Sequence, residues 1–377
     1  MTEKSTRLGF VGVSAGGSWA TRSHLPYLKS PKNITGYKIV ALQNRTKESA
    51  EKAASANDLS NVTCYGDPAA LAADPNVDIV AVSVNVPGHL EAIEPALKAK
   101  KDVFVEWPLA RNLKEAEHVT SLAKENGVRT MVGLQARQNP SIVKAKEMVE
   151  ANELGTILGT TMTAYGMIFG DSFQQAFAYA LLVENGANLL TIPAGHAMDA
   201  MCWVLGEMSD LQATLGNLRP TLDLIDDSGK VFGEGQKTAH DMVAVTGHLA
   251  NGGGVVCVNY KGGMSPAGIP GFSWVISGTK GTLVLDGGMG HVQMWQPKIS
   301  FVKAGQGAKL EDIAVEHIGT DYSYTGGDFS YAVGKAWEAF AGKGEGTVTT
   351  FEDALVRHRM IDAIYRSHEK GTRESYI

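Results

Sequence analysis

The sequence has few cysteines, no long apolar run and no cluster of basic residues. Three cysteines, Cys64, Cys202 and Cys257, occur in 377 residues without CxxC spacing, which argues against a disulfide framework and a zinc or other metal site. The longest apolar runs, such as AFAYALLV at 176–183, are too short to cross a bilayer. Lysine and arginine are dispersed and the net charge is −6, so neither nucleic acid nor a membrane is an expected partner.

The first residues also lack a targeting signal. The segment MTEKSTR is polar and leads straight into a strand, which predicts a protein without a secretion signal. Together with the low cysteine content, this favours a reducing, cytoplasmic location. Glycine, by contrast, is abundant at 43 of 377 residues, and it gathers at turns. The length predicts two domains.

Short apolar runs alternate with helical stretches over residues 1–138. We expect strands at Arg7–Val13, Tyr37–Asn44, Asp78–Asn85, Asp102–Glu106 and Arg129–Gln135, and helices at Ser18–Leu28, Lys47–Ala56, Pro68–Ala73, Leu90–Ala99 and Leu113–Asn126. Runs such as VDIVAVSV are rich in β-branched residues, as in strands that are covered on both faces. The pattern predicts an α/β fold with a doubly wound parallel sheet.

After Pro140 the pattern changes to longer strands with alternating polarity. A helix at Ser141–Asn152 precedes segments such as DMVAVTGHL and GGGVVCVNYKGG, which are separated by glycine-rich turns. This predicts an α+β domain over 139–350 with an open, mostly antiparallel sheet. A final helix, Phe351–Glu369, is expected to pack back on the first domain as part of residues 351–377.

The turn VGVSAGGS lies between the first strand and the first helix, where a dinucleotide pyrophosphate binds in Rossmann domains. Gly12 occupies the position of the tight turn, and Ser14 stands where the backbone approaches the pyrophosphate. Gly16 and Gly17 open the helix. The position of this turn favours a nicotinamide cofactor site over an unrelated glycine-rich turn.

The end of the second strand bears on which cofactor binds. It reads ALQNRTK and carries no acid to accept from a ribose hydroxyl; Asn44 and Arg45 stand there instead. Arg45 can pair with a 2′-phosphate, so we expect NADP(H), with NAD(H) as the alternative if Arg45 is a solvated loop cation.

The stretch VFVEWPLARNLKEAEHV, at 103–119, resembles the glucose–fructose oxidoreductase and inositol 2-dehydrogenase family, whose Rossmann strand ends in Glu-Lys-Pro. Glu106 and Pro108 keep their places, and Trp107 replaces the lysine. The segments VNVPGHLEA, GLQARQNP and SGTKGTLVLDG are similar to further motifs of the family. The resemblance implies that Asn85, His89, Glu106 and Trp107 line the cofactor site, with Glu106 bonding backbone amides, and that the bond before Pro108 is cis.

The catalytic motif of that family is incomplete here. The family carries an aspartate four residues before a histidine; this chain has His196, but Ile192 takes the place of the aspartate. A dehydrogenase needs a base and usually a cation near the developing alkoxide, and Trp107 supplies neither. The catalytic candidates are therefore His196, Trp107 and Tyr165, and the substrate candidates are Gln135, Arg137 and Asp199.

Each of these assignments has a structural alternative. Trp107 can be an aromatic wall of the cofactor cleft or part of the core. His196 can be a proton donor or a buried histidine bonded to Asp199. Arg137 can hold a substrate anion or form a salt bridge.

The Glu-Trp pair and the segment NGANLLTIPAGHAMD are also similar to one branch of the family, the fungal galactose-regulon repressors. Three functions remain open: an NADP(H)-dependent oxidoreductase on a sugar, polyol or small carbonyl compound, a cofactor-binding transcriptional regulator, and a non-redox enzyme using the same cleft. The first is our expectation. The regulator would add a protein partner and a nuclear location, and relatives imply a homodimer through the open sheet.

Overall fold

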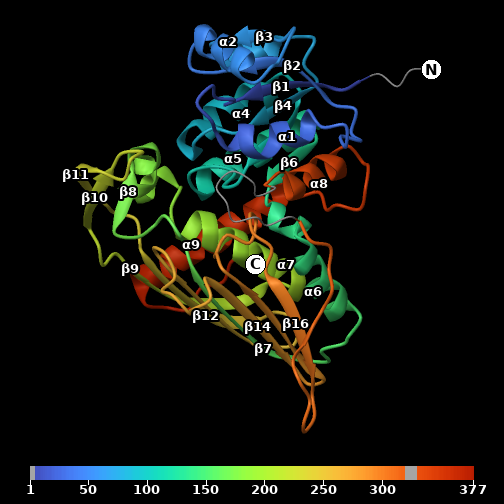
Figure 1. Ribbon diagram of the computed structural model, residues 1–377, viewed down its shortest axis with the longest axis vertical. Helices are drawn as coiled ribbons and strands as arrows, with labels where there is room; N and C mark the ends of the chain where they lie inside the picture. Colours follow the sequence, from blue (N-terminus) through green and yellow to red (C-terminus); the bar gives the residue numbers. More distant parts are fainter. Residues whose placement is uncertain (1–4, 319–328) are drawn as a thin grey trace. The chain divides into compact units, whose positions relative to one another are not determined.

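The computed structural model describes residues 5–318 and 329–377 and divides into two compact units (Figure 1). The first unit comprises Met1–Gln138 and Asp321–Leu355, and the second comprises Asn139–Thr320 and Val356–Ile377. No helix in the described part of the chain is long and apolar enough to cross a membrane.

A six-stranded parallel sheet forms the centre of the first unit. Its strands are β1 (Arg7–Val11), β2 (Lys38–Gln43), β3 (Thr63–Tyr65), β4 (Ile79–Val82), β5 (Asp102–Glu106) and β6 (Thr130–Gly133). They lie in the order β3-β2-β1-β4-β5-β6, which confirms the predicted doubly wound sheet. The strand order reverses between β1 and β4, and a ligand is expected at the carboxyl ends of these strands.

Helices flank this sheet. They are the π-helical turn η1 (Ala20–His24), α1 (Leu25–Leu28), α2 (Lys47–Ala56), α3 (Pro68–Ala73), η2 (Val86–Gly88), α4 (His89–Lys98), α5 (Leu113–Asn126), η3 (Gln135–Gln138) and α8 (Ser330–Phe340). The side chains of Thr46, Asp67 and Asn112 cap α2, α3 and α5 by accepting backbone N–H bonds. Helix α8 was not expected; its Trp337 packs on Phe104 of β5, with ring centroids 4.2 Å apart.

The second unit is built on an eight-stranded mixed sheet. Its strands are β7 (Ile157–Tyr165), β9 (Met208–Gly216), β12 (Met242–Leu249), β13 (Val255–Lys261), β14 (Phe272–Gly278), β15 (Gly281–Gly287), β16 (Lys298–Lys303) and β17 (Glu311–Asp312). The order is β17-β16-β15-β14-β7-β13-β12-β9, and among the described strands of this sheet only the β7–β13 pair is parallel. This confirms the expected open, mostly antiparallel sheet.

Alternation along these strands separates a covered face from an uncovered one. In β13, Val256, Val258 and Tyr260 are buried, whereas Val255 and Cys257 are exposed. The helices α6 (Pro140–Glu150), α7 (Gly195–Leu205) and α9 (Phe351–Lys370) lie over the covered face of this sheet (Figure 1). The remaining elements are β8 (Ser172–Gln174), β10 (Thr221–Ile225) and β11 (Val231–Gln236), which form a small sheet, with η4 (Gln175–Leu181), η5 (Val183–Asn185) and η6 (Leu190–Ala194).

The C-terminal segment differs from the expectation that residues 351–377 pack on the first domain. From Val356 onward the chain groups with the second unit. Ser367 Oγ accepts a hydrogen bond from the Ala213 amide at 2.9 Å, and Leu211 and Glu374 exchange backbone hydrogen bonds of 2.9 Å each. Polar groups near the end of this segment thus find their partners along β9, while α8 is the late helix that joins the first unit.

One buried cation ties α9 to α7. Arg357 Nε lies 3.5 Å from the Asp199 carboxylate, and the guanidinium also bonds Glu207. The Arg357 and Asp199 side chains are 1% and 0% exposed. Breaking a buried ion pair by removing one partner is strongly destabilising.

We therefore expect Arg357→Met to destabilise the protein by about 3–5 kcal/mol, because it removes the cation from a buried ion pair with Asp199. Arg366→Met on the same helix is the control, since Arg366 pairs with Asp362 and Glu374 near the surface and such pairs contribute about 0–1 kcal/mol. Urea unfolding followed by tryptophan fluorescence measures both. Equal losses in the two variants would contradict a structural role for the buried pair.

Candidate functional site

The glycine loop begins where β1 passes the chain after β4. Gly12 has φ +97°, and a Cβ built there would lie 2.3 Å from the Ser83 carbonyl oxygen. Any other residue would therefore force the two segments apart. Gly17 also has φ +97°, in open space at the far end of the loop. The tight turn assigned to Gly12 is present at the carboxyl edge of the sheet.

Ser14 occupies the close-approach position, and its hydroxyl is bonded within the loop. Its hydroxyl accepts a hydrogen bond from the Gly16 amide at 3.2 Å. The amide of Asn57 donates to the Ser14 carbonyl at 3.1 Å, and the amide of Asn44 donates to the Val13 carbonyl at 2.8 Å. The loop is thus held from β2 and α2, and Asn44, expected to contact the cofactor, also supports the loop backbone.

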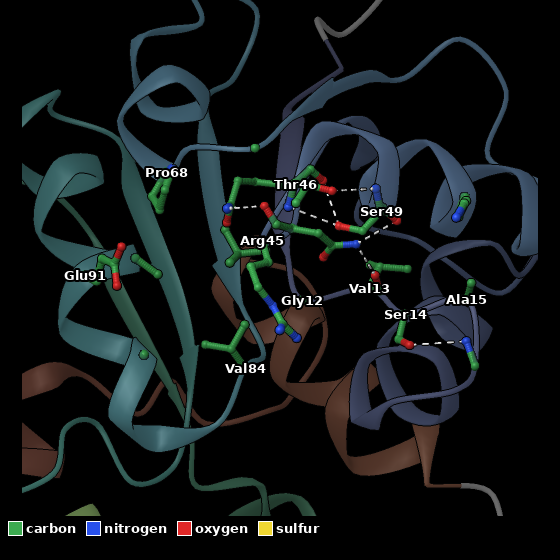
Figure 2. A pocket seen from close by; sticks show the side chains of 18 residues that line it. Gly12, Val13, Ser14, Ala15, Arg45, Thr46, Ser49, Pro68, Val84 and Glu91 are labelled. Atoms are coloured by element: carbon green, nitrogen blue, oxygen red, sulfur yellow. Dashed lines mark hydrogen bonds between the residues drawn. The ribbon is translucent and has the colours of Figure 1, made fainter. Parts of the chain in front are cut away.

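A pocket of about 730 Å³ opens at this edge of the first unit (Figure 2). It brings together five of the predicted cofactor residues: Gly12, Ser14, Gly16, Asn44 and Arg45. The other lining residues are Val11, Val13, Ala15, Gln43, Thr46, Ser49, Lys52, Gly66, Pro68, Val84, Gly88, Glu91 and Ala92. A nicotinamide dinucleotide fits these residues, because a glycine-cradled turn and a cationic side chain face the same space.

Arg45 is the charged group at the end of β2. Its side chain is exposed, and within residues 5–318 and 329–377 it makes no hydrogen bond or ion pair. Figure 2 shows it extending into the pocket, apart from the hydrogen bonds that join Thr46 and Ser49. An unpaired guanidinium lining a pocket is a ready partner for an anion.

Sequence reasoning missed Lys52, a second cation that lines this pocket from α2. Its signal was indirect: α2 starts at Lys47, directly after Arg45 and the capping residue Thr46. A side chain in the second turn of that helix can reach the end of β2. Glu91 of α4 is the one acid among the lining residues.

His89 joins two loops at the carboxyl ends of β4 and β5. Its Nδ1 lies 2.9 Å from the Pro108 carbonyl oxygen and its Nε2 lies 3.0 Å from the Val84 carbonyl oxygen. Burial lowers the pKa of His89. The neutral ring carries one N–H and so donates to one of these two carbonyls, and it does not line the pocket. Asn85, next to Val84, is exposed and outside the lining as well.

Glu106 has a different partner from the backbone amides that we expected. Its carboxylate lies 2.6 Å from His24 Nε2, and the Trp337 indole donates to His24 Nδ1 at 3.0 Å. An indole N–H can only donate, so His24 Nδ1 accepts and Nε2–H donates to Glu106. This buried chain fastens β5 to η1 and α8. Glu106 is therefore occupied within the first unit, outside the pocket lining.

Trp107 follows β5 directly and is 5% exposed. The Trp107–Pro108 bond is cis, as expected from the resemblance. Gln135, after β6, is 2% exposed, and its Oε1 has no hydrogen-bond partner among the described residues. Neither side chain lines the pocket at the glycine loop, so the assignments of Trp107 and Gln135 to a site stay predictions.

Arg137, a substrate candidate, lies 3.4 Å from the Asp353 carboxylate in the same unit and is 8% exposed. Next to it, Gln138 and Thr347 exchange two hydrogen bonds, of 2.6 and 3.1 Å. These contacts join η3 to the late segment 321–355, and they favour the salt-bridge alternative for Arg137.

The second unit carries His196, Asp199 and Tyr165. Burial lowers the pKa of His196 to about 3, and the nearby His291 adds to the effect. Asp199 pairs with Arg357 and is fully buried, so its carboxylate is not available to a substrate. Tyr165 lies under the Lys261 ammonium, 5.3 Å from the ring centroid, and its alternation places it opposite the buried Ala164. Helix α7, which carries His196, lies over the covered face of the sheet, whereas the Tyr165 side chain is on the uncovered face.

Two family models match successive parts of the chain. Residues 6–134 match the oxidoreductase family with an NAD-binding Rossmann fold, and residues 140–287 match the C-terminal domain of Gal80p. The boundary between the matches coincides with the junction of the two units at Gln138 and Asn139. The Rossmann match supports a nicotinamide cofactor at the glycine loop.

Relatives align with nearly the whole chain. Dehydrogenase aclE of Aspergillus oryzae is 34% identical over 376 residues, which cover 99% of each chain. The galactose/lactose metabolism regulatory protein GAL80 of Saccharomyces cerevisiae is 28% identical over 97% of this chain and 93% of its own. The crystal structure of a super-repressor mutant of Gal80p from the same yeast superposes with a TM-score of 0.88, at 25% identity over 98% of this chain and 97% of that chain.

The depressed pKa of His196 predicts how stability depends on pH. The unfolded chain protonates this ring near pH 6.5, whereas the folded chain does so only near 3. Stability is therefore fully present above about pH 6.5 and falls as the pH drops toward 3, by about 1.4 kcal/mol per pH unit for this group. We expect His196→Gln to take up about one proton fewer on unfolding in this pH range, so its unfolding free energy should depend less steeply on pH. Urea unfolding at several pH values measures this slope.

The control is His118→Gln, because it replaces a histidine whose ring is 51% exposed. A change of slope confined to His196→Gln would assign the pH dependence to the buried ring. A wild-type slope in His196→Gln would show that His196 titrates normally in the folded protein.

Proposed function

Because this chain belongs to the oxidoreductase family with an NAD-binding Rossmann fold, we propose that it is an NADP(H)-dependent oxidoreductase acting on a sugar, a polyol or a small carbonyl compound. The observation that carries the proposal is the pocket at the glycine loop, where Arg45 stands exposed and unpaired among the described residues. The relative named a dehydrogenase, which is 34% identical along the whole chain, supports redox chemistry.

The choice of NADP(H) over NAD(H) rests on charge. Arg45 and Lys52 both line the pocket, and no acid follows β2 to accept from a ribose hydroxyl. A 2′-phosphate would satisfy both cations with charge-assisted hydrogen bonds. The backbone from Gly12 to Gly17 would hold the pyrophosphate, with Ser14 keeping its hydroxyl folded onto Gly16.

When bound, the nicotinamide would supply or accept the hydride. Among the residues of this chain, His196 is the candidate to move the proton of the substrate oxygen, and Trp107 to form an apolar wall at the carboxyl end of β5. Tyr165 is the weaker candidate, because its ring packs against Lys261 on the uncovered face of the sheet. His89 would act indirectly, by holding the loops after β4 and β5.

One observation favours a second function, that of a cofactor-binding regulator without turnover. His196 is neutral over the physiological range but a weak base, since its pKa lies near 3, and no lysine stands at Trp107 to stabilise an alkoxide. The relative named a galactose/lactose metabolism regulatory protein aligns over 97% of the chain. In this case the protein would bind NADP(H) and a protein partner, and would not consume the cofactor.

A single experiment separates the two functions. Purified protein is titrated with NADPH by fluorescence, and a panel of sugars, polyols and aldehydes is then added while the nicotinamide absorbance is followed, with NADP⁺ used for the alcohols. Binding with an absorbance change supports the oxidoreductase. Binding without any change across the panel supports the regulator, and absence of binding refutes both.

The role of Arg45 gives a direct test of cofactor choice. We expect Arg45→Ala to weaken NADPH binding by about tenfold or more, because a charge-assisted hydrogen bond contributes about 1.5–3 kcal/mol. Affinity for NADH should stay the same. Lys47→Ala is the matched control, since Lys47 is a neighbouring exposed cation that does not line the pocket. An unchanged NADPH affinity in Arg45→Ala would refute the assignment.

We also propose that the uncovered face of the large sheet pairs two copies of the chain. One row across this face consists of Gln212, Thr246, Cys257, Thr161, Val275 and Val284, which are neighbours on adjacent strands. None of the six is charged, and Val255 near the end of the same face is 57% exposed. An uncharged, partly apolar row across the face fits the centre of a self-complementary interface.

Cys257 lies in the middle of this row, so Cys257→Arg should convert a dimer into a monomer by placing two guanidinium groups against each other. The change is on an exposed position and should leave the fold intact. Analytical ultracentrifugation gives the result, with Gln306→Arg, in an exposed loop, as the control. A wild-type protein that sediments as a monomer would exclude the pairing.

A further inference from the structure

The turn between β15 and β16 carries His291, which lies near His196 of α7, and Gln293, which bonds His291. His291 Nε2 lies 3.1 Å from the Gly166 carbonyl oxygen, directly after β7, and His291 Nδ1 lies 3.1 Å from Gln293 Nε2. A carbonyl oxygen can only accept, so His291 carries its proton on Nε2 and Nδ1 must accept. The Gln293 group that faces His291 is therefore its NH₂, and Oε1 points elsewhere.

Backbone contacts hold this turn in place. The Tyr260 hydroxyl donates to the Gly290 carbonyl at 2.9 Å, and the Asn139 amide donates to the Val292 carbonyl at 3.0 Å. A Cβ at Gly290 would lie 2.2 Å from the Tyr165 carbonyl oxygen, so the turn lies directly against the end of β7. Burial also lowers the pKa of His291 to about 4, which keeps its ring neutral near pH 7.

Two buried polar atoms next to His291 have no hydrogen-bond partner among the described residues. They are Gln293 Oε1 and His196 Nδ1, and their side chains are 6% and 3% exposed. Buried polar atoms are nearly always paired, because leaving one unpaired costs the water contact that it gave up. Both atoms belong to residues beside the fixed imidazole of His291. We therefore expect a ligand that supplies their missing hydrogen-bond partners.

We propose that Gln293 Oε1 contacts the substrate directly and selects for a hydroxyl group, while His291 is a positioning residue that fixes the orientation of the Gln293 amide. The substrate hydroxyl donates to Oε1, and His196 Nδ1 meets a neighbouring polar atom of the same molecule. A carboxylate is disfavoured at Oε1, because an amide oxygen has no proton to offer to an anionic oxygen. This inference rests on the proposed function, whose substrate it describes.

The test uses the full chain and measures binding separately from turnover. Calorimetry is run with myo-inositol, D-galactose and D-glucose, with and without NADPH, on the wild type and on Gln293→Met, which keeps the volume and removes the acceptor. We expect at least one of the three to bind, and its affinity to fall at least tenfold in Gln293→Met. Gln306→Met, in an exposed loop, is the matched control and should bind as the wild type does.

A second measurement needs no variant of Gln293. Monodeoxyfluoro analogues of the bound probe lack one O–H donor each, and at least one should bind the wild type about tenfold more weakly. His291→Phe, which lets the Gln293 amide rotate, should reduce this discrimination about threefold without changing affinity for NADPH. A purely structural role of His291 would leave the ratio unchanged.

The proposal is overturned if none of the three probes binds, if Gln293→Met binds as tightly as the wild type, or if all fluoro analogues bind like the parent compound. NADPH affinity, measured in the same samples, tests the proposed function on its own. Normal NADPH binding and turnover with an unaffected Gln293→Met variant would refute this inference alone.

Discussion

The close passage of β1 past the chain after β4 is the constraint on which the candidate cofactor site depends. Only a hydrogen atom fits at Gly12, because the Ser83 carbonyl lies where a side chain would begin. The order of strands reverses at this point, so the two segments form the walls of the crevice that ligands use in such sheets. Val11 and Val84, one on each segment, both line the pocket. The side-chain amides of Asn44 and Asn57 hydrogen-bond the backbone of the glycine loop, which lines the same pocket.

The first unit was largely predictable because its signals are local. Buried β-branched runs marked the strands, the helical stretches between them marked the helices, and the glycine turn together with Arg45 marked the cofactor site. What the sequence did not reveal was α8, a short apolar helix whose position depends on Trp337 packing against Phe104, far away along the chain. Strand β3 was not predicted either, because three residues are too few to show the alternation of polar and apolar side chains that marks a strand.

The individual charges were harder to predict than the fold. Glu106, Arg137 and Asp199 were placed in the site from motifs, and each has a partner remote in sequence: His24, Asp353 and Arg357. A motif identifies which residue type stands at a position. Which partner its side chain bonds is decided by tertiary packing, which the motif does not show. Gln293 illustrates the converse, because no local pattern drew attention to it and only the hydrogen bonds around His291 show which atom is left unpaired.

The pairing of Glu374 with Leu211 also has a consequence for how the sheet meets other chains. An edge strand with free backbone groups is a template to which a foreign strand can add, and this is a common route to aggregation. Here the segment after α9 covers part of β9, and at the opposite edge β17 is only two residues long. Growth of the sheet by edge addition is thereby discouraged at both ends, so the pairing of two copies that we propose would use the broad face.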